Sequence, residues 1–330
     1  MAVLVTGGAG YIGSHMVYTL VDAGEDTVVL DDLSTGVRGA VPPKARLIVG
    51  DIADTALVLR VIAEHEIEEI VHFAAKIVVP DSVVDPLGYY LSNTVKSRAL
   101  LAAAVASGVR RIVFSSTAAV YGMPAANPVA EDAPALPISP YGSSKLMTEW
   151  MLRDAAAAHS LGYVVLRYFN VAGADPAGRA GQSSARSTHL IKVAVELALG
   201  KRAQMEIFGT DYPTPDGTCI RDYVHVADLV AAHLDALHHL RRGGASLVLN
   251  CGYGRGYSVL QVLDAVKRAS GADLSVKIGG RRAGDPAALV ARSDRIRGEL
   301  GWQPQYDDLD LIVTHSLAWE RKLPDKPLAA

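Results

Sequence analysis

The chain has 330 residues, half of them apolar, which is enough to form a full hydrophobic core in one or two domains. Its formal net charge of −3, with both signs interspersed, leaves neither a basic stripe for nucleic acid nor a polybasic patch for membranes, so we expect no partner of either kind. The two cysteines exclude a disulfide framework, and the lack of a signal-peptide pattern or a membrane-spanning apolar run predicts a cytoplasmic protein.

The first predicted strand covers residues 2–5 and leads into a glycine-rich turn, which a helix follows as far as Gly24. Gly7, Gly10 and Gly13 lie in this turn with the spacing of a dinucleotide-binding loop. Glycines allow the backbone to approach a pyrophosphate, and the helix N-terminus offers unpaired N–H groups and the positive end of its dipole. The segment therefore predicts a dinucleotide-binding site.

An acidic pair stands at the end of the second predicted strand, residues 28–30. The carboxylates of Asp31 and Asp32 are suited to bind the hydroxyls of an adenosine ribose. Two negative charges there should repel a 2′-phosphate, which favours NAD over NADP as the cofactor. Arg38 opposes this preference, because a guanidinium at that place is able to bind the phosphate.

Strands and helices continue to alternate through the first half of the chain, in the order typical of βαβ units. Further strands are predicted at 46–49, 70–73, 111–114 and 163–166, and helices at 56–65, 86–108 and 141–160. This alternation predicts an α/β fold with a Rossmann-type, doubly wound parallel sheet over residues 1–172.

The second half has shorter elements. A loop rich in Gly, Ser and Arg covers 173–187. Helices are predicted at 189–199, 228–240, 258–270 and 309–322, and strands at 205–208, 220–225 and 247–249. We predict a smaller C-terminal α/β substrate domain over residues 173–330, from which some segments return to the first domain.

Tyr141 and Lys145 lie about one turn apart on one face of the predicted helix 141–160. A free tyrosine has a pKa near ~10, and a neighbouring ammonium group lowers it by favouring the phenolate. The pair therefore has the composition of a general base and its activator, although any helix of this length also carries such a pair by chance.

Three further groups each have a structural and a functional interpretation. The hydroxyl side chains at 115–117 either cap a strand or bind a substrate oxygen. The alanines at 74–75 either allow close packing of a helix or let a ligand approach the carboxyl edge of the sheet. Arg221, Arg281 and Arg282 are suited to bind a diphosphate, or are ordinary surface arginines.

Several short motifs resemble those of one known family. They are TGGAGYIGS at 6–14, HFAA at 72–75, SSTAAVYG at 115–122, YGSSK at 141–145, RYFN at 167–170, FGTDYPTPDGT at 208–218, RDYVHV at 221–226 and RRAGD at 281–285. Over nearly its whole length the chain is similar to the extended short-chain dehydrogenase/reductases, and most closely to the UDP-glucose (UDP-galactose) 4-epimerases among them. The resemblance implies galactose metabolism, with NAD bound by residues 1–172 and a UDP-sugar by residues 173–330.

The resemblance also assigns the cofactor site. The residues implied to contact NAD are Gly7, Gly10, Tyr11, Ile12, Gly13, Asp31, Asp32, Asp51, Ile52, Phe73, Ala74, Ala75, Ser115, Tyr141, Lys145 and Tyr168. The glycines would carry the pyrophosphate and Asp31 the adenosine ribose, while Asp51 and Ile52 would flank the adenine. NAD should stay bound, because the implied reaction regenerates it.

The implied reaction is an inversion at C4 of the sugar through a 4-keto intermediate. Tyr141 would take the proton of the 4-hydroxyl while hydride leaves C4 for NAD, and the keto sugar would turn over and take the hydride back on its other face. Lys145 would hold the hydroxyl of Tyr141 and the nicotinamide ribose, and Thr117 would bind the 4-oxygen. The residues implied to contact the UDP-sugar are Thr117, Tyr141, Asn170, Phe208, Arg221, Tyr223 and Arg282.

Two positions depart from the family pattern. The lysine that the best-known members carry after the His-Phe motif stands one residue earlier here, at Lys76, and Ile77 takes its place, so a contact on the nicotinamide side is open. Leu289 stands where strict glucose/galactose epimerases often have tyrosine and members that accept N-acetyl sugars have a small residue. Leucine is between these in size, so acceptance of acetamido sugars is open as well.

Other functions differ from this expectation in specific ways. A 4-epimerase of another UDP-sugar (an N-acetylhexosamine, a uronate or a pentose) would use the same chemistry and stays open. A sugar 4,6-dehydratase needs an acid pair where Ala118 and Ala119 stand, which argues against it. A dehydrogenase would exchange its cofactor freely, and a non-catalytic sensor would not need Thr117, Tyr141 and Lys145 intact.

The resemblance further predicts a homodimer. The helices at 86–108 and 141–160 pack across a two-fold axis in the family, and their Ala, Leu and Met content suits close packing between helices. Packing within one subunit would suit the same composition.

Overall fold

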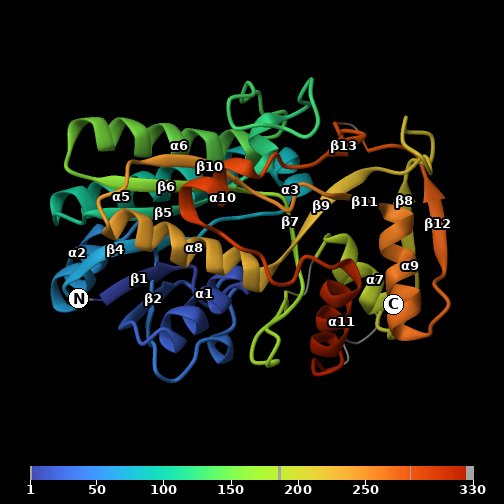
Figure 1. Cartoon of the computed structure of the whole chain (residues 1–330). Coiled ribbons are helices and arrows are strands. Elements are labelled where there is room, and N and C mark those ends of the chain that lie inside the picture. The colour runs from blue at the N-terminus through green and yellow to red at the C-terminus, as the bar shows by residue number, and fades with distance from the viewer. Residues whose placement is uncertain (1, 185–186, 283, 325–330) are drawn as a thin grey trace.

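The computed structural model describes residues 2–184, 187–282 and 284–324. Residue 283 of the 281–285 motif and residues 185–186 of the loop predicted at 173–187 lie outside the described residues. Figure 1 shows a wide sheet with helices on both faces and a smaller group of elements beside it. No helix of the described ranges is long and apolar enough to cross a bilayer.

The wide sheet has seven parallel strands in the order β10-β6-β5-β4-β1-β2-β3. Its strands are β1 (Ala2–Thr6), β2 (Thr27–Asp31), β3 (Arg46–Val49), β4 (Ile67–His72), β5 (Arg111–Thr117), β6 (Gly162–Tyr168) and β10 (Leu247–Cys251). The apolar runs of β1 and β2 are buried at every residue, as a sheet covered on both faces requires. The strand order reverses between β1 and β4, which is where a doubly wound sheet opens a crevice at its carboxyl edge. The predicted Rossmann-type fold is therefore confirmed.

Helices pack against the two faces in separate groups, as Figure 1 shows. The elements on one face are α2 (Thr55–Glu64), α5 (Lys96–Ala106) and α6 (Pro140–Ala158), and those on the other are α1 (Tyr11–Asp22) and α8 (Val226–Arg241). Leu100 and Leu152 are fully buried in the first layer, and Met16 and Leu237 in the second. Each such side chain contributes roughly 1.5–3 kcal/mol by leaving water.

The stretch predicted as one helix at 86–108 is helical but not uniform. It consists of α4 (Pro86–Tyr89), the π-helical segment η2 (Tyr90–Val95) and α5. Hydrophobic periodicity does not distinguish a π segment from α-helix, so the sequence did not indicate it. Such segments are frequent at functional sites.

The smaller group of elements is built around β9 (Ile220–His225). This strand pairs with β7 (Asn170–Ala172), β11 (Gly256–Ser258) and β13 (Ala288–Leu289), while β8 (Met205–Phe208) pairs with β12 (Val276–Gly279). The other elements of the described residues, not all of which belong to this smaller group, are α3 (Val79–Val84), α7 (Leu190–Ala198), α9 (Val259–Ser270), α10 (Asp294–Leu300), α11 (Leu309–Glu320) and the short 3₁₀ segments η1 (Arg38–Ala40) and η3 (Ala118–Tyr121). Although β10 and α8 follow residue 172, they belong to the wide sheet and its cover.

Candidate active site

A cradle with no room for side chains lies between β1, the start of α1 and the end of β4. Gly7 has φ +71°, and a Cβ on it would lie 2.6 Å from the backbone nitrogen of Ala74. A Cβ on Gly13 would lie 2.1 Å from the carbonyl oxygen of Gly7. The first turn of α1, which follows Gly10, receives no side-chain cap. An uncapped helix start carries unpaired backbone N–H groups and the positive end of the helix dipole, which favour an anion such as a pyrophosphate.

The two predicted acidic residues at the end of β2 differ in position. Asp31 is buried, and its two carboxylate oxygens accept from the backbone N–H of Ala9 at 2.9 Å and of Leu33 at 2.8 Å. Burial raises the pKa of Asp31, while these two hydrogen bonds lower it. Each oxygen keeps a second lone pair for a ribose hydroxyl. Asp32 is exposed and accepts from Ser34, so Asp31 is the carboxylate that adjoins the glycine turn.

Asp51 has a partner that sequence reasoning missed. Its carboxylate is bound by the ammonium group of Lys96 on α5 and accepts from the backbone N–H of Ala53 at 2.9 Å. Burial raises the pKa of Asp51, but the hydrogen bonds from Lys96 and Ala53 together with the charge of Lys96 outweigh this and lower it. Lys96 therefore fixes the carboxylate that the resemblance places beside the adenine. The neighbouring Ile52 is buried in the hydrophobic core beside this predicted adenine position.

Helix α6 begins one residue before Tyr141, the first residue of the predicted catalytic pair. The side chain of Ser139 caps the helix by accepting from the N–H of Gly142 at 3.2 Å, and Pro140 takes the first helical position. Tyr141 therefore lies in the first turn, with the side chain of Thr117 at the end of β5 close enough to its hydroxyl to lower the pKa of the phenol. The structure brings these two predicted residues together.

Burial dominates the protonation of the pair on α6. It raises the pKa of Tyr141 to about 12 and lowers that of Lys145 to about 7. The ammonium group of Lys145 donates to the carbonyl oxygen of Ser115 at 2.8 Å. A further positive charge beside the phenol, such as an oxidised nicotinamide ring carries, is thus needed for the phenolate at neutral pH.

Asn93, in the π-helical segment, ties this helix to the loop after β4. Its side chain accepts from the N–H of Lys76 at 2.8 Å, donates to the carbonyl of Lys76 at 2.9 Å and donates to the hydroxyl of Ser144 at 3.0 Å. The hydroxyl of Ser144 donates in turn to the carbonyl of Tyr141 at 2.7 Å. The ammonium group of Lys76 lies 3.6 Å from Asp85 at the surface, so only the backbone of Lys76 belongs to this arrangement.

Three of the predicted substrate residues lie on the paired strands β7 and β9, and Phe208 is the last residue of β8. Asn170 of β7 and Tyr223 of β9 are direct partners across the strand pair. Arg221, two residues before Tyr223, donates to the carbonyl oxygen of Pro286 at 2.8 Å. The guanidinium of Arg282 lies over the ring of Phe208, 3.7 Å from its centre. The structure thus places Arg221 on the same strand as Tyr223 and Arg282 against Phe208, and their role as diphosphate ligands stays a prediction.

The third arginine of that prediction is placed differently. Arg281 forms an ion pair with Asp211 at 2.8 Å, and both side chains are exposed. Its guanidinium also lies over the ring of Tyr212. These contacts give Arg281 a structural role at the surface, which is one of the two interpretations that the sequence left open.

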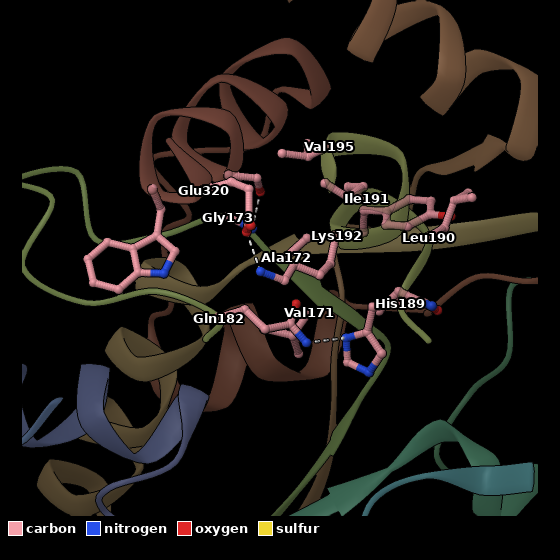
Figure 2. Close-up of a pocket in the computed structure, with 14 residues that line it drawn as sticks. Val171, Ala172, Gly173, Gln182, His189, Leu190, Ile191, Lys192, Val195 and Glu320 are labelled. Atoms are coloured by element: carbon pink, nitrogen blue, oxygen red, sulfur yellow. Dashed lines mark hydrogen bonds and ion pairs between the residues drawn. The ribbon is translucent and has the colours of Figure 1, made fainter. Parts of the chain in front are cut away.

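Figure 2 shows a pocket beside Asn170 and Tyr223 whose other residues were not predicted. Gln182 and His189 face each other there, with the amide nitrogen 3.5 Å from Nδ1 of the imidazole. An ion pair between Lys192 and Glu320 closes one side. The sequence predicted His189 only as the start of a helix, and no spacing signal marked it as a site residue.

The remaining predicted cofactor residues lie around the ends of β4 and β6. Phe73 and Tyr168 both contact His233 of α8, and Ala74 forms the wall opposite Gly7. The hydroxyl of Tyr11 donates to the carbonyl oxygen of Gly173 at 2.7 Å, so the backbone is the part of Tyr11 left for a cofactor. Ile12 and Ala75 are partly buried beside these groups.

Comparison with known proteins agrees with this geometry. The sequence profile of the NAD dependent epimerase/dehydratase family matches residues 3–252. A UDP-glucose 4-epimerase from Azospirillum brasilense is 59% identical over 97% of this chain and 92% of its own length. A solved UDP-glucose 4-epimerase from Brucella ovis in complex with NAD has a TM-score of 0.94 and 42% identity over 96% of this chain and 97% of that one. One from Bifidobacterium longum in complex with NAD+ and UDP has a TM-score of 0.93 and 36% identity over 98% and 99%.

Proposed function

The chain belongs to the NAD dependent epimerase/dehydratase family, and on that premise we propose that it interconverts UDP-galactose and UDP-glucose by inversion at C4 of the sugar. The closeness of the Thr117 side chain to the hydroxyl of Tyr141 is the observation that carries this proposal, because it gathers a proton acceptor and a hydroxyl at one point of the sheet edge. A sugar 4-hydroxyl bound there would meet both groups.

NAD is the cofactor, and the residues present fit it. The cradle at Gly7 and Gly13 excludes side chains, the start of α1 is uncapped, and Asp31 keeps acceptor capacity for a ribose. When bound, NAD supplies a hydride acceptor and a positive ring. Lys145 would hold the nicotinamide ribose while its charge, together with that ring, lowers the pKa of Tyr141 toward neutrality.

The substrate half of the site would bind UDP and leave the hexose able to turn. Arg221 and Arg282 provide cations for the diphosphate, and Asn170, Phe208 and Tyr223 form walls around it. The guanidinium of Arg221 already has its polar partners in Asp285 and the backbone of Pro286, which hold it in place. Anchoring the diphosphate would keep the 4-keto sugar bound while its two faces exchange.

We propose a division of work along the chain that follows the same contacts. Residues 1–172, together with β10 and α8, would bind NAD, and the rest of 173–330 would bind the UDP-sugar. We also propose that the protein works in the cytoplasm, where NAD and nucleotide sugars are its expected ligands.

We propose further that the protein is a homodimer. Leu87, Leu91 and Val95, spaced by four residues, are 78%, 54% and 52% exposed, and Trp150 on α6 is 47% exposed. These side chains lie on the two helical stretches that the sequence predicted to meet a second copy, and contiguous exposed apolar residues of this kind mark interaction surfaces.

One experiment tests the central proposal. The purified protein is incubated with UDP-galactose and no added NAD, UDP-glucose formation is followed, and NAD is assayed after denaturation. We expect conversion with about one NAD per chain, because the reaction regenerates its hydride acceptor. Bound NAD without conversion would move the substrate to a uronate, pentose or acetamido sugar. Conversion that began only after NAD was supplied would argue against a retained cofactor.

A further inference from the structure

His233, in the middle of α8, is a fully buried histidine at the cofactor end of the sheet. Its Nδ1 lies 2.9 Å from the carbonyl oxygen of Leu229. A carbonyl can only accept, so Nδ1 carries the proton. Burial lowers the pKa of His233 to about 4, which leaves the ring neutral and Nε2 unprotonated at physiological pH.

The hydroxyl of Tyr168 must therefore donate to Nε2 of His233, with which it forms a hydrogen bond. A phenol has one O–H to give, so the phenolic oxygen of Tyr168 is left as an acceptor, and the side chain of Ser115 lies close enough to it to lower the pKa of Tyr168. The backbone carbonyl of the same Ser115 accepts from Lys145 at 2.8 Å. The direction of the hydrogen bonds is thus fixed from Tyr168 to α8, and Ser115, which lies beside Tyr168, holds the lysine of the predicted catalytic pair.

The ring of His233 also contacts a second residue at the cofactor end of the sheet, the aromatic side chain of Phe73. It lies 4.9 Å from the ring of Phe73, centre to centre. Phe73 directly precedes Ala74, whose backbone adjoins Gly7 in the cradle. Because α8 covers the face of the sheet opposite α6, His233 reaches these residues from the side away from Tyr141.

We propose that His233 is a positioning residue of the cofactor site, which holds the hydroxyl of Tyr168 and the ring of Phe73 in place from the face of the sheet opposite Tyr141. The proposal rests on the proposed function, because it concerns the NAD that the reaction uses. A merely structural histidine would fill space between α8 and β6. A positioning histidine acts through Tyr168, and that is the difference to measure.

Three variants separate the two roles. His233→Phe keeps a ring against Phe73 but removes the acceptor for Tyr168. His233→Gln keeps an acceptor near the place of Nε2. His238→Phe, on the same helix and only partly buried, is the matched control. Each is made in the wild-type chain and in the Tyr168→Phe background, and circular dichroism reports whether it folds.

The readouts are the NAD content of the denatured protein and the kcat and KM for UDP-galactose. We expect His233→Phe to lose NAD and to lower kcat by about 10- to 100-fold with little change in KM, because the substrate arginines lie elsewhere. His233→Gln should lie closer to wild type, and His238→Phe should equal it. In the Tyr168→Phe background the His233→Phe substitution should change kcat less than about twofold, because its target is gone.

Three results would overturn the proposal. The first is full NAD content and wild-type kcat in folded His233→Phe. The second is a double variant in which the separate effects of His233→Phe and Tyr168→Phe on kcat multiply. The third is a lower kcat in His233→Phe when Tyr168→Phe leaves kcat unchanged. If His233→Phe does not fold, the comparison of His233→Gln in the two backgrounds decides. A wild-type protein that holds NAD but does not convert UDP-galactose would contradict the proposed function alone, since NAD content would still test His233.

Discussion

The ammonium group of Lys145 donates to the backbone carbonyl oxygen of Ser115 at 2.8 Å, which places the lysine of the predicted catalytic pair against the end of β5. Burial lowers the pKa of Lys145 to about 7, so in the protein alone this side chain is only partly protonated at neutral pH. In the proposed mechanism this charge would lower the pKa of the Tyr141 phenol.

Replacing this lysine by Met should therefore move the pH dependence of the reaction. In Lys145→Met the phenol keeps a high pKa, so kcat should fall by at least about 100-fold near pH 7 and recover as the pH rises. The measurement is kcat from pH 6 to 9.5, with Lys145→Arg as the variant that keeps the charge. An acid limb at the same pH in wild type and Lys145→Met would show that the lysine does not set the pKa of the base.

Tyr141→Phe should leave the fold and the NAD content unchanged and lower turnover by roughly 100- to 10,000-fold. The substitution removes the hydroxyl that lies beside Thr117 but keeps the ring in the first turn of α6. Turnover with UDP-galactose and NAD released on denaturation are measured side by side. Near-normal turnover would remove Tyr141 as the base, and loss of NAD would mean that the hydroxyl serves the cofactor instead.

The sequence predicted those parts of the fold and of the site that depend on local order along the chain. The glycine turn, the acid after β2 and the helix that carries Tyr141 are each specified by residues close together in the sequence, and the structure places them at one edge of the sheet.

The supporting contacts could not be predicted in this way. Asn93 and Ser144 are 51 residues apart, Asp51 and Lys96 are 45 apart, and Tyr168 and His233 are 65 apart. Each pair forms only when strands and helices from separate βαβ units lie side by side, and no spacing rule connects such positions. The π-helical segment that holds Asn93 could not be predicted either. An extra residue in one turn does not change the overall apolar character of a long helix, so the sequence pattern looks the same.

The buried His72 predicts a specific loss of stability in acid. Its ring nitrogens lie 2.7 Å from the hydroxyl of Thr6 and 2.8 Å from that of Ser97, and burial lowers its pKa to about 3. In the unfolded chain this histidine has a pKa near ~6.5 and takes up a proton as the pH falls, whereas in the folded chain it stays neutral. The free energy of unfolding therefore decreases as the pH falls from about 6.5 toward 3. Between pH 6.5 and 5 this side chain alone should cost about 2 kcal/mol.

Urea unfolding at pH 7 and pH 5 checks this in wild type and His72→Gln. The variant should be less stable at pH 7 but lose about 2 kcal/mol less than wild type on acidification, because its side chain does not titrate. An equal loss in both proteins would assign the acid sensitivity to other groups.

Leu289→Tyr should narrow the sugar range. Leu289 packs beside Ala118 and Phe169, the neighbours in sequence of Thr117 and Asn170. A larger ring there would reduce the space beside the sugar, so we expect activity on UDP-N-acetylglucosamine to fall at least tenfold more than activity on UDP-galactose, on the order of what steric exclusion in a pocket gives. Leu59→Tyr on α2 is the control. An unchanged ratio of the two activities would show that Leu289 does not set the range.

Leu91→Asp should convert the proposed dimer to a monomer. Leu91 is 54% exposed in the π-helical segment, between the exposed Leu87 and Val95, and a buried unpaired carboxylate at a subunit interface costs several kcal/mol. Light scattering at micromolar concentration should give twice the chain mass for wild type and the single chain mass for the variant. Leu260→Asp on α9, where the leucine is 37% exposed, is the matched control and should stay dimeric. A wild-type monomer would contradict the dimer directly, and a dimeric Leu91→Asp would move the interface to another surface.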